Sequence, residues 1–460
     1  MALPVDFIAR TRALLGEEYD PLSEALADEA PVSIRLNPHK GITMEAERVP
    51  WCETGYYLTE RPPFTFDPLF HAGAYYVQEA SSMFVEQAIR HFVTQPVTGL
   101  DLCAAPGGKS THLYSLLPAG SALVSNEVIR SRSHILAENI QKWGYPNGIV
   151  TQNDPAEIGE LRHLFDVVLA DVPCSGEGMF RKDADSTGEW SIANVMHCAA
   201  RQRRIIQSIW PALKPGGLLI YSTCTYNTEE DEDNIQYIIN ELGAEALAIP
   251  VPDEWNICGA LKHTNPVYRF FPHRTKGEGF FLAILRKTGP SDEEARRLKP
   301  KDKKAKEKST PAFTDWKSFL QAGETYKPVW NDTLLRLLPP ELQSIYPLLS
   351  EKLHILSAGI EAGELKGKDF IPSQALALST ALRPDAFPSV EIDWQTAIAY
   401  LRKEAFALPA GAPRGYVLLR YRSHPLGFVK NLGNRANNLY PAEWRIRSSY
   451  LPEEEPLFLR

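Results

Sequence analysis

The sequence predicts an α/β protein whose central domain is an open, mostly parallel sheet covered by helices on both faces. Residues 97–224 contain five apolar runs of strand length, and helical patterns separate these runs. Each run is apolar along most of its length, which is typical of strands that are buried on both faces. At 460 residues the chain is too long for one hydrophobic core, so we expect further domains on either side.

The central domain is expected over residues 71–287, after an N-terminal α+β extension at 1–70 that carries one strand candidate, VSIRLN. Two apolar stripes have the i, i+3, i+4, i+7 spacing of a helix, at positions 85/88/89/92 and 206/209/210/213. A last segment, from VYRFFPH to GEGFFLAILRK, predicts a closing antiparallel hairpin. The expected strands of the sheet are 97–103, 122–128, 148–154, 165–172 and 217–224.

The C-terminal part is expected to follow a charged linker. Residues 286–308 hold ten basic and five acidic residues and almost nothing apolar, so we assign 288–312 to a solvated linker. Residues 313–388 predict a small mixed domain. Residues 389–460, which include GYVLLRYRSHPLGFVKNLGNR, predict short β-strands joined by glycine turns.

Composition excludes several classes of protein. The N-terminus lacks the features of a secretory signal, and no stretch has the roughly 18 apolar residues of a membrane span. The six cysteines lie far apart without a CxxC pair, which argues against a disulfide framework or a zinc site. We therefore expect a cytoplasmic protein with no membrane partner and no metal. The net charge of −8 does not suggest a nucleic-acid protein, but residues 414–449 contain seven Lys or Arg and one acid, and such a local basic region can bind phosphate.

The first strand of the sheet runs into the motif CAAPGGKS, residues 103–110, and then into a helix. Small residues let the backbone approach a ligand, and the helix N-terminus offers free N–H groups. A dinucleotide fingerprint, GxGxxG, is absent. A phosphate-binding P-loop would need a glycine where Cys103 stands. The motif therefore favours a nucleoside cofactor without a polyphosphate.

Acidic residues stand at the ends of four successive strands: Asp101, Glu127, Asp154 and Asp171. A carboxylate at the position of Glu127 can accept hydrogen bonds from ribose hydroxyls, and Asp154 is placed for an adenine amino group. Each acid alone is more often a helix cap or a turn residue. Together they predict an adenosyl pocket.

Two cysteines follow the fourth and fifth of these strands, in the turns Asp171-Val172-Pro173-Cys174 and Ser222-Thr223-Cys224. Neighbouring strand ends would bring both thiols to one rim beside the cofactor. A buried cysteine usually fills space, but two in adjacent polar turns indicate covalent chemistry. Nearby positive charge, such as that of Lys109, would favour a thiolate. The spacing leaves open which thiol attacks.

The motifs CAAPGGKS, DVPCSGEGMFRKD, YSTCTYNTEEDE and PHRTKGEGFF resemble those of the Nol/Nop/Sun family of RNA cytosine-5 methyltransferases. The resemblance covers most of the chain and is strongest over 73–285. It implies a Rossmann-like class I methyltransferase core, S-adenosylmethionine as cofactor and a PUA-like RNA-binding domain at 389–460. It also implies an RNA substrate, for which we expect small-subunit (16S) ribosomal RNA.

In such a reaction a thiolate adds to C6 of cytosine and makes C5 nucleophilic. The resemblance implies that the nucleophile is Cys224 and that Cys174 assists product release; DNA cytosine-5 methyltransferases attack instead with the cysteine of a Pro-Cys motif. Asp171 is placed to hold a proton near N3 of the base. The implied cofactor-binding residues are Cys103, Ala104, Ala105, Pro106, Gly107, Gly108, Lys109, Glu127, Asp154 and Asp171.

RNA would be held by basic side chains around the site and in the C-terminal domain. On short strands the C-terminal aromatic residues would point inward and the cations outward. An ordinary solvated surface is the alternative for each cation. We expect a monomer, and the alternatives for function are a transfer-RNA methyltransferase and a non-catalytic RNA-binding assembly factor. The predicted RNA contacts are Arg181, Lys182, Arg274, Arg420, Lys430 and Arg445.

Overall fold

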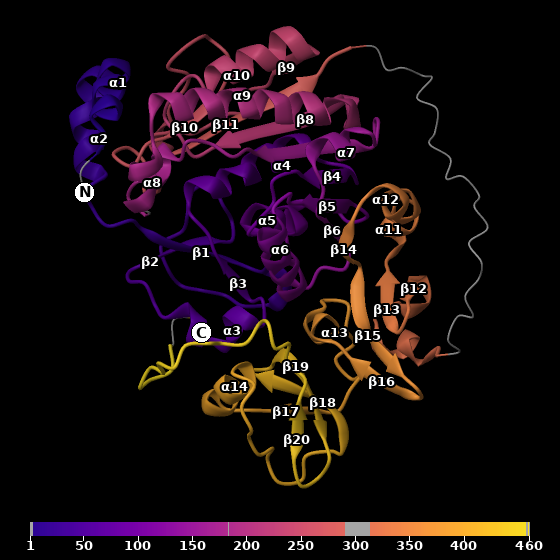
Figure 1. Ribbon diagram of the computed structural model, residues 1–460. Coiled ribbons are helices and arrows are strands. Elements are labelled where there is room, and N and C mark those ends of the chain that lie inside the picture. Colours follow the sequence, from indigo (N-terminus) through magenta and orange to yellow (C-terminus); the bar gives the residue numbers. More distant parts are fainter. Residues whose placement is uncertain (1–2, 183, 290–312, 457–458, 460) are drawn as a thin grey trace.

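The computed structural model describes residues 3–182, 184–289, 313–456 and 459 (Figure 1). Five parallel strands form the middle of its largest sheet, in the order β8-β7-β4-β5-β6. Read from β6 to β8 and numbered along the chain, this order is 3-2-1-4-5. It is the doubly wound arrangement in which ligands bind where the order reverses, here between β4 and β7. The five strands confirm the prediction: β4 (Thr98–Asp101), β5 (Ala122–Asn126), β6 (Gly148–Thr151), β7 (Phe165–Asp171) and β8 (Leu213–Thr223).

Helices cover both faces of this sheet, as predicted (Figure 1). Successive strand residues alternate between two cores: Leu123 packs in one and Val124 in the other. Burying each such side chain contributes about 1.5–3 kcal/mol. The first core includes residues of α4 (Val85–Phe92), α5 (Gly108–Leu116) and α6 (Arg130–Trp143), and the second those of α7 (Pro155–Gly159), α9 (Ile192–Ile209) and α10 (Glu232–Tyr237).

The apolar stripe at 85–92 lies on α4 as predicted, but the second stripe is only partly helical. Helix α9 ends at Ile209. Trp210 begins a short 3-10 turn and Leu213 already belongs to β8. Pro211 is the physical reason, because a proline has no backbone N–H to continue the hydrogen bonds of the helix.

Further strands extend the sheet at both edges. The predicted antiparallel hairpin is confirmed as β10 (Tyr268–Phe270) and β11 (Phe280–Lys287), with β11 beside β8. The short strand β9 (Ala244–Ala246) also pairs with β11. At the opposite edge, β14 (Ile355–Ala358) pairs antiparallel with β6. The segment 313–388, expected as a small domain of its own, thus shares a strand with the central sheet.

The rest of that segment forms a four-stranded antiparallel sheet in the order β12-β13-β15-β16. The predicted charged linker at 288–312 lies, from residue 290 on, outside the described residues. The elements of this segment are β12 (Lys327–Asn331), β13 (Leu334–Leu338), β15 (Ile360–Lys366), β16 (Asp369–Pro372), α11 (Pro340–Gln343), α12 (Tyr346–Lys352) and α13 (Gln374–Leu378).

The N-terminal extension and the C-terminal module share one hydrophobic core, although they lie at opposite ends of the chain (Figure 1). Ile34 and Leu36 of the extension belong to the same buried cluster as Val417 and Leu419. The extension continues past the expected boundary at residue 70, because β3 (Tyr75–Val77) pairs with β1 (Val32–Leu36). Its other elements are α1 (Val5–Leu15), α2 (Tyr19–Ala25), α3 (Pro68–His71) and β2 (Gly55–Leu58), which is also antiparallel to β1. The C-terminal module has α14 (Trp394–Leu401), β17 (Ser389–Glu391), β18 (Gly415–Tyr421), β19 (His424–Asn431) and β20 (Ala436–Asn438).

In the part of the chain that the structure describes, no helix is long and apolar enough to cross a bilayer.

Candidate active site

Two thiols meet at the carboxyl edge of the sheet, as the sequence predicted. β7 and β8 are parallel neighbours, with Asp171 opposite Ser222, so the turns that follow them end at the same rim. The Sγ atoms of Cys174 and Cys224 are 3.1 Å apart, and both residues are half-buried. Both are free cysteines, because the S–S bond of a disulfide is about 2.05 Å long. The rim therefore presents two thiols in direct contact.

The hydrogen bond with Cys224, together with burial, raises the pKa of Cys174 well above its ordinary value. Cys174 therefore keeps its proton at neutral pH. A protonated thiol can donate a hydrogen bond or a proton to its neighbour.

An ion pair lies beside the thiols. The Lys109 ammonium donates to Asp171 Oδ2 at 2.9 Å, and the Ser222 hydroxyl donates to Asp171 Oδ1 at 2.7 Å. Burial opposes the charge on Lys109, but Asp171 and Cys224 raise its pKa above the ordinary value. The lysine therefore brings a fixed positive charge to the rim, which favours a thiolate. The sequence did not single out Ser222, although its place one strand over from Asp171 was the available signal.

The motif at residues 103–110 connects β4 with α5, as predicted. Gly107 has φ = 117°, a conformation that favours glycine, and α5 begins at Gly108 with its first N–H groups unpaired in the helix. Behind this loop the Ser110 hydroxyl donates to Asp101 Oδ2 at 2.6 Å, and burial raises the pKa of Asp101 to about 7. Burial also raises the pKa of Cys103 far above its ordinary range. This third cysteine therefore keeps its proton, and it packs against the second core.

The strand-end acids differ in what they do. Glu127 follows β5 and is buried; it accepts from the Ile129 N–H at 2.9 Å. Arg132, which sequence reasoning missed, donates to the Ala105 carbonyl at 2.8 Å and ties α6 to the motif loop. Asp154 is exposed and caps α7 through the Ala156 N–H, which is the alternative that its sequence position left open.

These residues fit an adenosyl cofactor. The loop 103–109, Glu127 and Asp154 follow three adjacent strands, β4, β5 and β6. Carboxylates at these positions are acceptors for ribose hydroxyls and an amino group. The one cation of the loop, Lys109, is paired with Asp171, so it is not free for a phosphate. The donor and acceptor set therefore suits a nucleoside.

The structure corrects the prediction that Arg181 contacts RNA. Its side chain is 6% exposed and pairs with Glu278. The same guanidinium donates to the carbonyls of Ala25 and Gly277. These bonds join the extension to the loops around the site. A phosphate could bind Arg181 only by displacing Glu278, which would leave that buried carboxylate without its partner.

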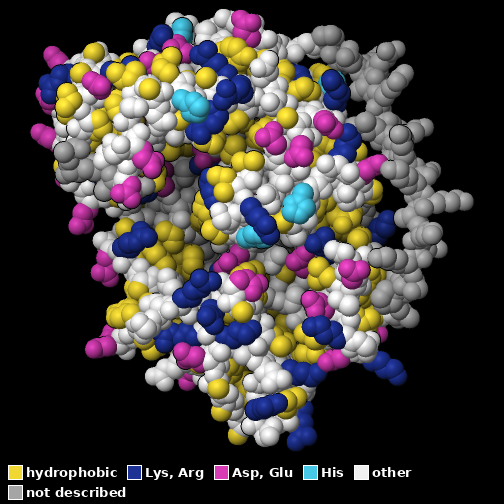
Figure 2. All heavy atoms as spheres, viewed as in Figure 1, with side chains coloured by type: hydrophobic (Ala, Val, Ile, Leu, Met, Phe, Trp, Pro, Cys, Tyr) yellow, Lys and Arg dark blue, Asp and Glu magenta, His cyan; other side chains and the backbone are white. Residues whose placement is uncertain are grey.

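The other predicted RNA contacts lie at the surface. Lys182 is about one-third exposed, Arg274 pairs with Glu18, Lys430 pairs with Asp369, Arg420 donates to backbone carbonyls and Arg445 is exposed. Figure 2 shows Lys and Arg side chains at the lower end of the molecule, where β18–β20 lie. Tyr421, Phe428 and Tyr440 are buried, so the inward placement of these three aromatic residues is confirmed. Tyr416 and Trp444 of the same module are only half-buried.

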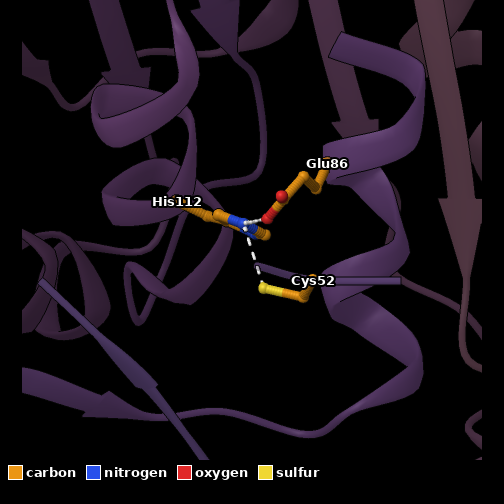
Figure 3. A group of neighbouring side chains, drawn as sticks. All are labelled: Cys52, Glu86 and His112. Carbon is orange, nitrogen blue, oxygen red and sulfur yellow. Dashed lines mark hydrogen bonds and ion pairs between the residues drawn. The ribbon is translucent and has the colours of Figure 1, made fainter. Parts of the chain in front are cut away.

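A second cluster, which cysteine spacing could not reveal, joins Cys52, Glu86 and His112 (Figure 3). The ring Nε2 of His112 lies 2.9 Å from Glu86 Oε2 and 3.7 Å from Cys52 Sγ. Burial lowers the pKa of His112 to about 4; burial disfavours the Glu86 carboxylate too, but its hydrogen bond from His112 brings that pKa down to about 2. A neutral imidazole therefore donates to a carboxylate inside the core. That the chain uses no metal stays a prediction.

Three features together indicate a Rossmann-like methyltransferase: the strand order, the ends of β4, β5 and β6 that suit a nucleoside, and the two thiols in contact beside them. Three family models match the chain: the N-terminal domain of 16S rRNA methyltransferase RsmF at residues 3–80, 16S rRNA methyltransferase RsmB/F at 94–286 and the methyltransferase RsmF PUA domain at 387–446. The chain belongs to the RsmB/F family of methyltransferases. It is an S-adenosylmethionine-dependent RNA methyltransferase with a PUA domain, which confirms the expected family and cofactor.

Curated relatives match over almost their whole length. Ribosomal RNA small subunit methyltransferase F of Klebsiella pneumoniae is 31% identical, covering 96% of this chain and 96% of that protein. The protein of the same name from Aliivibrio fischeri strain MJ11 is 31% identical, covering 96% and 97%.

Solved structures are similar over the core. A methyltransferase homolog from Pyrococcus horikoshii is 30% identical with a TM-score of 0.52, covering 61% of this chain and 93% of that chain. NSun6 from the same organism, at 21% identity and a TM-score of 0.54, covers 63% and 99% and shows the shared fold alone.

Proposed function

We propose that this protein methylates C5 of one cytosine in small-subunit ribosomal RNA through a covalent bond between Cys224 and C6 of the base. The observation that carries the proposal is the contact of two free thiols, 3.1 Å apart, beside the edge that suits a nucleoside. The names of the relatives support small-subunit ribosomal RNA as the substrate. Action on ribosomal RNA fits the expected cytoplasmic location.

The chemistry divides a difficult substitution into easier steps. The Cys224 thiolate adds to C6, which makes C5 nucleophilic, and the charge of Lys109 favours that thiolate. Asp171, held by Lys109 and Ser222, is the acid that faces the ring near N3. Bound S-adenosylmethionine supplies the electrophilic methyl group. When water takes the C5 proton, the electrons of the C5–H bond re-form the C5–C6 double bond and expel the Cys224 sulfur from C6. The protonated Cys174 assists this release by donating its proton to the departing Cys224 thiolate.

The proposed cofactor site comprises the loop 103–109, Glu127, Asp154 and Asp171. The loop is made of small residues at a helix N-terminus, where the backbone can come close to a ligand. The target base must leave any helix to expose C6. The exposed cations of the C-terminal module, Arg420, Lys430 and Arg445, are proposed to contact the RNA backbone.

The experiment is methyl transfer from labelled S-adenosylmethionine to assembled small subunits, free 16S RNA and transfer RNA, with bisulfite sequencing of each. We expect one protected cytosine in the small-subunit RNA. Cys224→Ala should abolish it, whereas Cys258→Ser, at a cysteine outside the site, should not. Protection in transfer RNA alone would favour the alternative substrate, and the absence of any transfer would contradict the proposal.

A further inference from the structure

A pair of buried glutamates ties the two cysteine turns together. We call residues 173–180 the Pro-Cys loop and residues 224–230 the Thr-Cys loop. The backbone joins them at one point, where the Gly178 N–H donates to the Cys224 carbonyl at 2.9 Å. The Ser175 and Thr225 hydroxyls also meet at 3.2 Å, the Asn227 amide donates to the Ser175 hydroxyl at 3.3 Å, and the two thiols are in contact. The remaining links between the loops are made by two carboxylates, and neither carboxylate has a part in the chemistry described above.

Glu177 belongs to the Pro-Cys loop, but three of its hydrogen bonds reach the Thr-Cys loop. Its Oε2 accepts from the Thr225 hydroxyl at 2.6 Å and from the N–H groups of Tyr226 at 2.8 Å and Asn227 at 2.9 Å. Its Oε1 accepts from the Trp190 indole at 3.0 Å. The residue is 2% exposed. One buried carboxylate thus fixes the three residues that follow Cys224.

Glu230 makes the converse connection. It belongs to the Thr-Cys loop and accepts from the N–H of Ser175, the residue after Cys174, at 3.0 Å. The Gln202 amide donates to it at 2.7 Å and also donates to the Pro173 carbonyl. The Asn227 amide donates to its other oxygen at 2.8 Å. Glu230 is fully buried. Each loop therefore provides a carboxylate that binds the residues directly after the cysteine of the other loop.

We propose that Glu177 and Glu230 are positioning residues that form a reciprocal clamp and hold the two sulfur atoms in contact. The inference rests on the proposed roles of the thiols, because the release step needs Cys174 and Cys224 at the same ring. Misplacement of a reacting group by about 1 Å can cost about 100-fold in rate. The clamp keeps two loops, 50 residues apart in sequence, within that tolerance.

Glutamine is an informative substitute because every partner of both carboxylates is a donor. In either orientation of the new amide, its NH₂ group faces a donor instead of accepting from it. Glu177→Gln and Glu230→Gln therefore break part of the clamp at almost constant volume. Thr225→Val leaves both carboxylates in place and is the milder variant, should a glutamine variant not fold. It removes the hydroxyl that donates to Glu177; this hydroxyl also accepts from the Asn227 amide and contacts the Ser175 hydroxyl. Asp233→Asn is the matched control, because this acid of the same run pairs with Lys262 and His263 at the surface.

Two quantities are measured in the full-length protein. The first is kcat and KM for methylation of small-subunit RNA. The second is the rate at which hydrogen peroxide couples Cys174 to Cys224, without RNA or cofactor, followed by peptide mapping. In this coupling the two thiols lose their protons and two electrons to peroxide, which becomes two water molecules as the S–S bond forms. The coupling rate depends on the separation of the sulfur atoms and on the fraction of thiolate. It depends on no step of methyl transfer.

We expect the clamp variants that keep their melting temperature within a few degrees to lose at least tenfold in kcat, with KM within twofold. Their coupling rate should fall at least fivefold, while Asp233→Asn changes neither quantity. A wild-type coupling rate in a folded clamp variant overturns the clamp, whatever the activity. The two proposals can also fail separately. If the wild type methylates no RNA but the clamp variants still couple slowly, the clamp is supported and the proposed function is contradicted.

Discussion

Single buried side chains make this protein sensitive to acid. His71 lies between the extension and the C-terminal module, with its Nε2 2.9 Å from the Thr65 carbonyl and its Nδ1 3.4 Å from the Tyr440 hydroxyl. Burial lowers the pKa of His71 to about 3. The pKa of an unfolded histidine is about 6.5. Between pH 3 and pH 6.5, His71 is therefore protonated in the unfolded chain but not in the folded chain. The stability from this residue is complete above pH 6.5 and is lost as the pH falls.

We expect His71→Gln to flatten the fall of the free energy of unfolding between pH 6 and pH 4. One such histidine accounts for about 1.4 kcal/mol per pH unit. Urea denaturation at several pH values measures the slope, and His134→Gln, at an exposed histidine, is the control. An unchanged slope in His71→Gln would show that His71 is not the group that resists protonation.

At the scale of elements, the sequence predicted what local patterns determine. The five parallel strands are apolar runs, and their order placed both cysteine turns at one rim. The start of α9 at Ile192 was not predicted, because the apolar side chains of Ile192 and Met196 lie on the exposed side of its first turns and interrupt the amphipathic pattern. β14 was missed because its pairing with β6 joins segments about 200 residues apart.

The position of a site residue could be predicted where it belongs to a motif. It could not be predicted where the residue's contacts depend on a partner far away in the sequence. Cys174, Cys224 and the loop 103–109 lie where their motifs indicated. Arg181 looked like a phosphate ligand because its partner, Glu278, lies 97 residues further along the chain. The Cys52, Glu86 and His112 cluster has the same origin: three separate elements bring its members together.

At the scale of the whole molecule, the two ends of the chain behave as one body. Tyr400 and Leu419 of the C-terminal module and Ile34 and Tyr75 of the extension share a buried cluster. The C-terminal module is thus packed against the extension rather than joined to it by a flexible linker alone. The basic face over β18–β20 therefore keeps a defined orientation toward the rest of the enzyme.

We expect Leu419→Ala, at a fully buried position, to destabilise both ends together. Such a cavity costs about 2–5 kcal/mol. Hydrogen exchange should show faster exchange in β1 as well as in β18, while β4 keeps its protection. Faster exchange confined to residues 389–460 would mean that the module unfolds alone.

The most direct measurement of the central claim is a search for the covalent bond itself. Cys174→Ala protein is incubated with S-adenosylmethionine and small-subunit RNA, then denatured and resolved on a gel. We predict a denaturation-resistant band of protein joined to RNA, because the bond from Cys224 forms but breaks slowly, and no such band with Cys174→Ala/Cys224→Ala. A band that persists without Cys224, or full methylation by Cys224→Ala alone, would contradict the account.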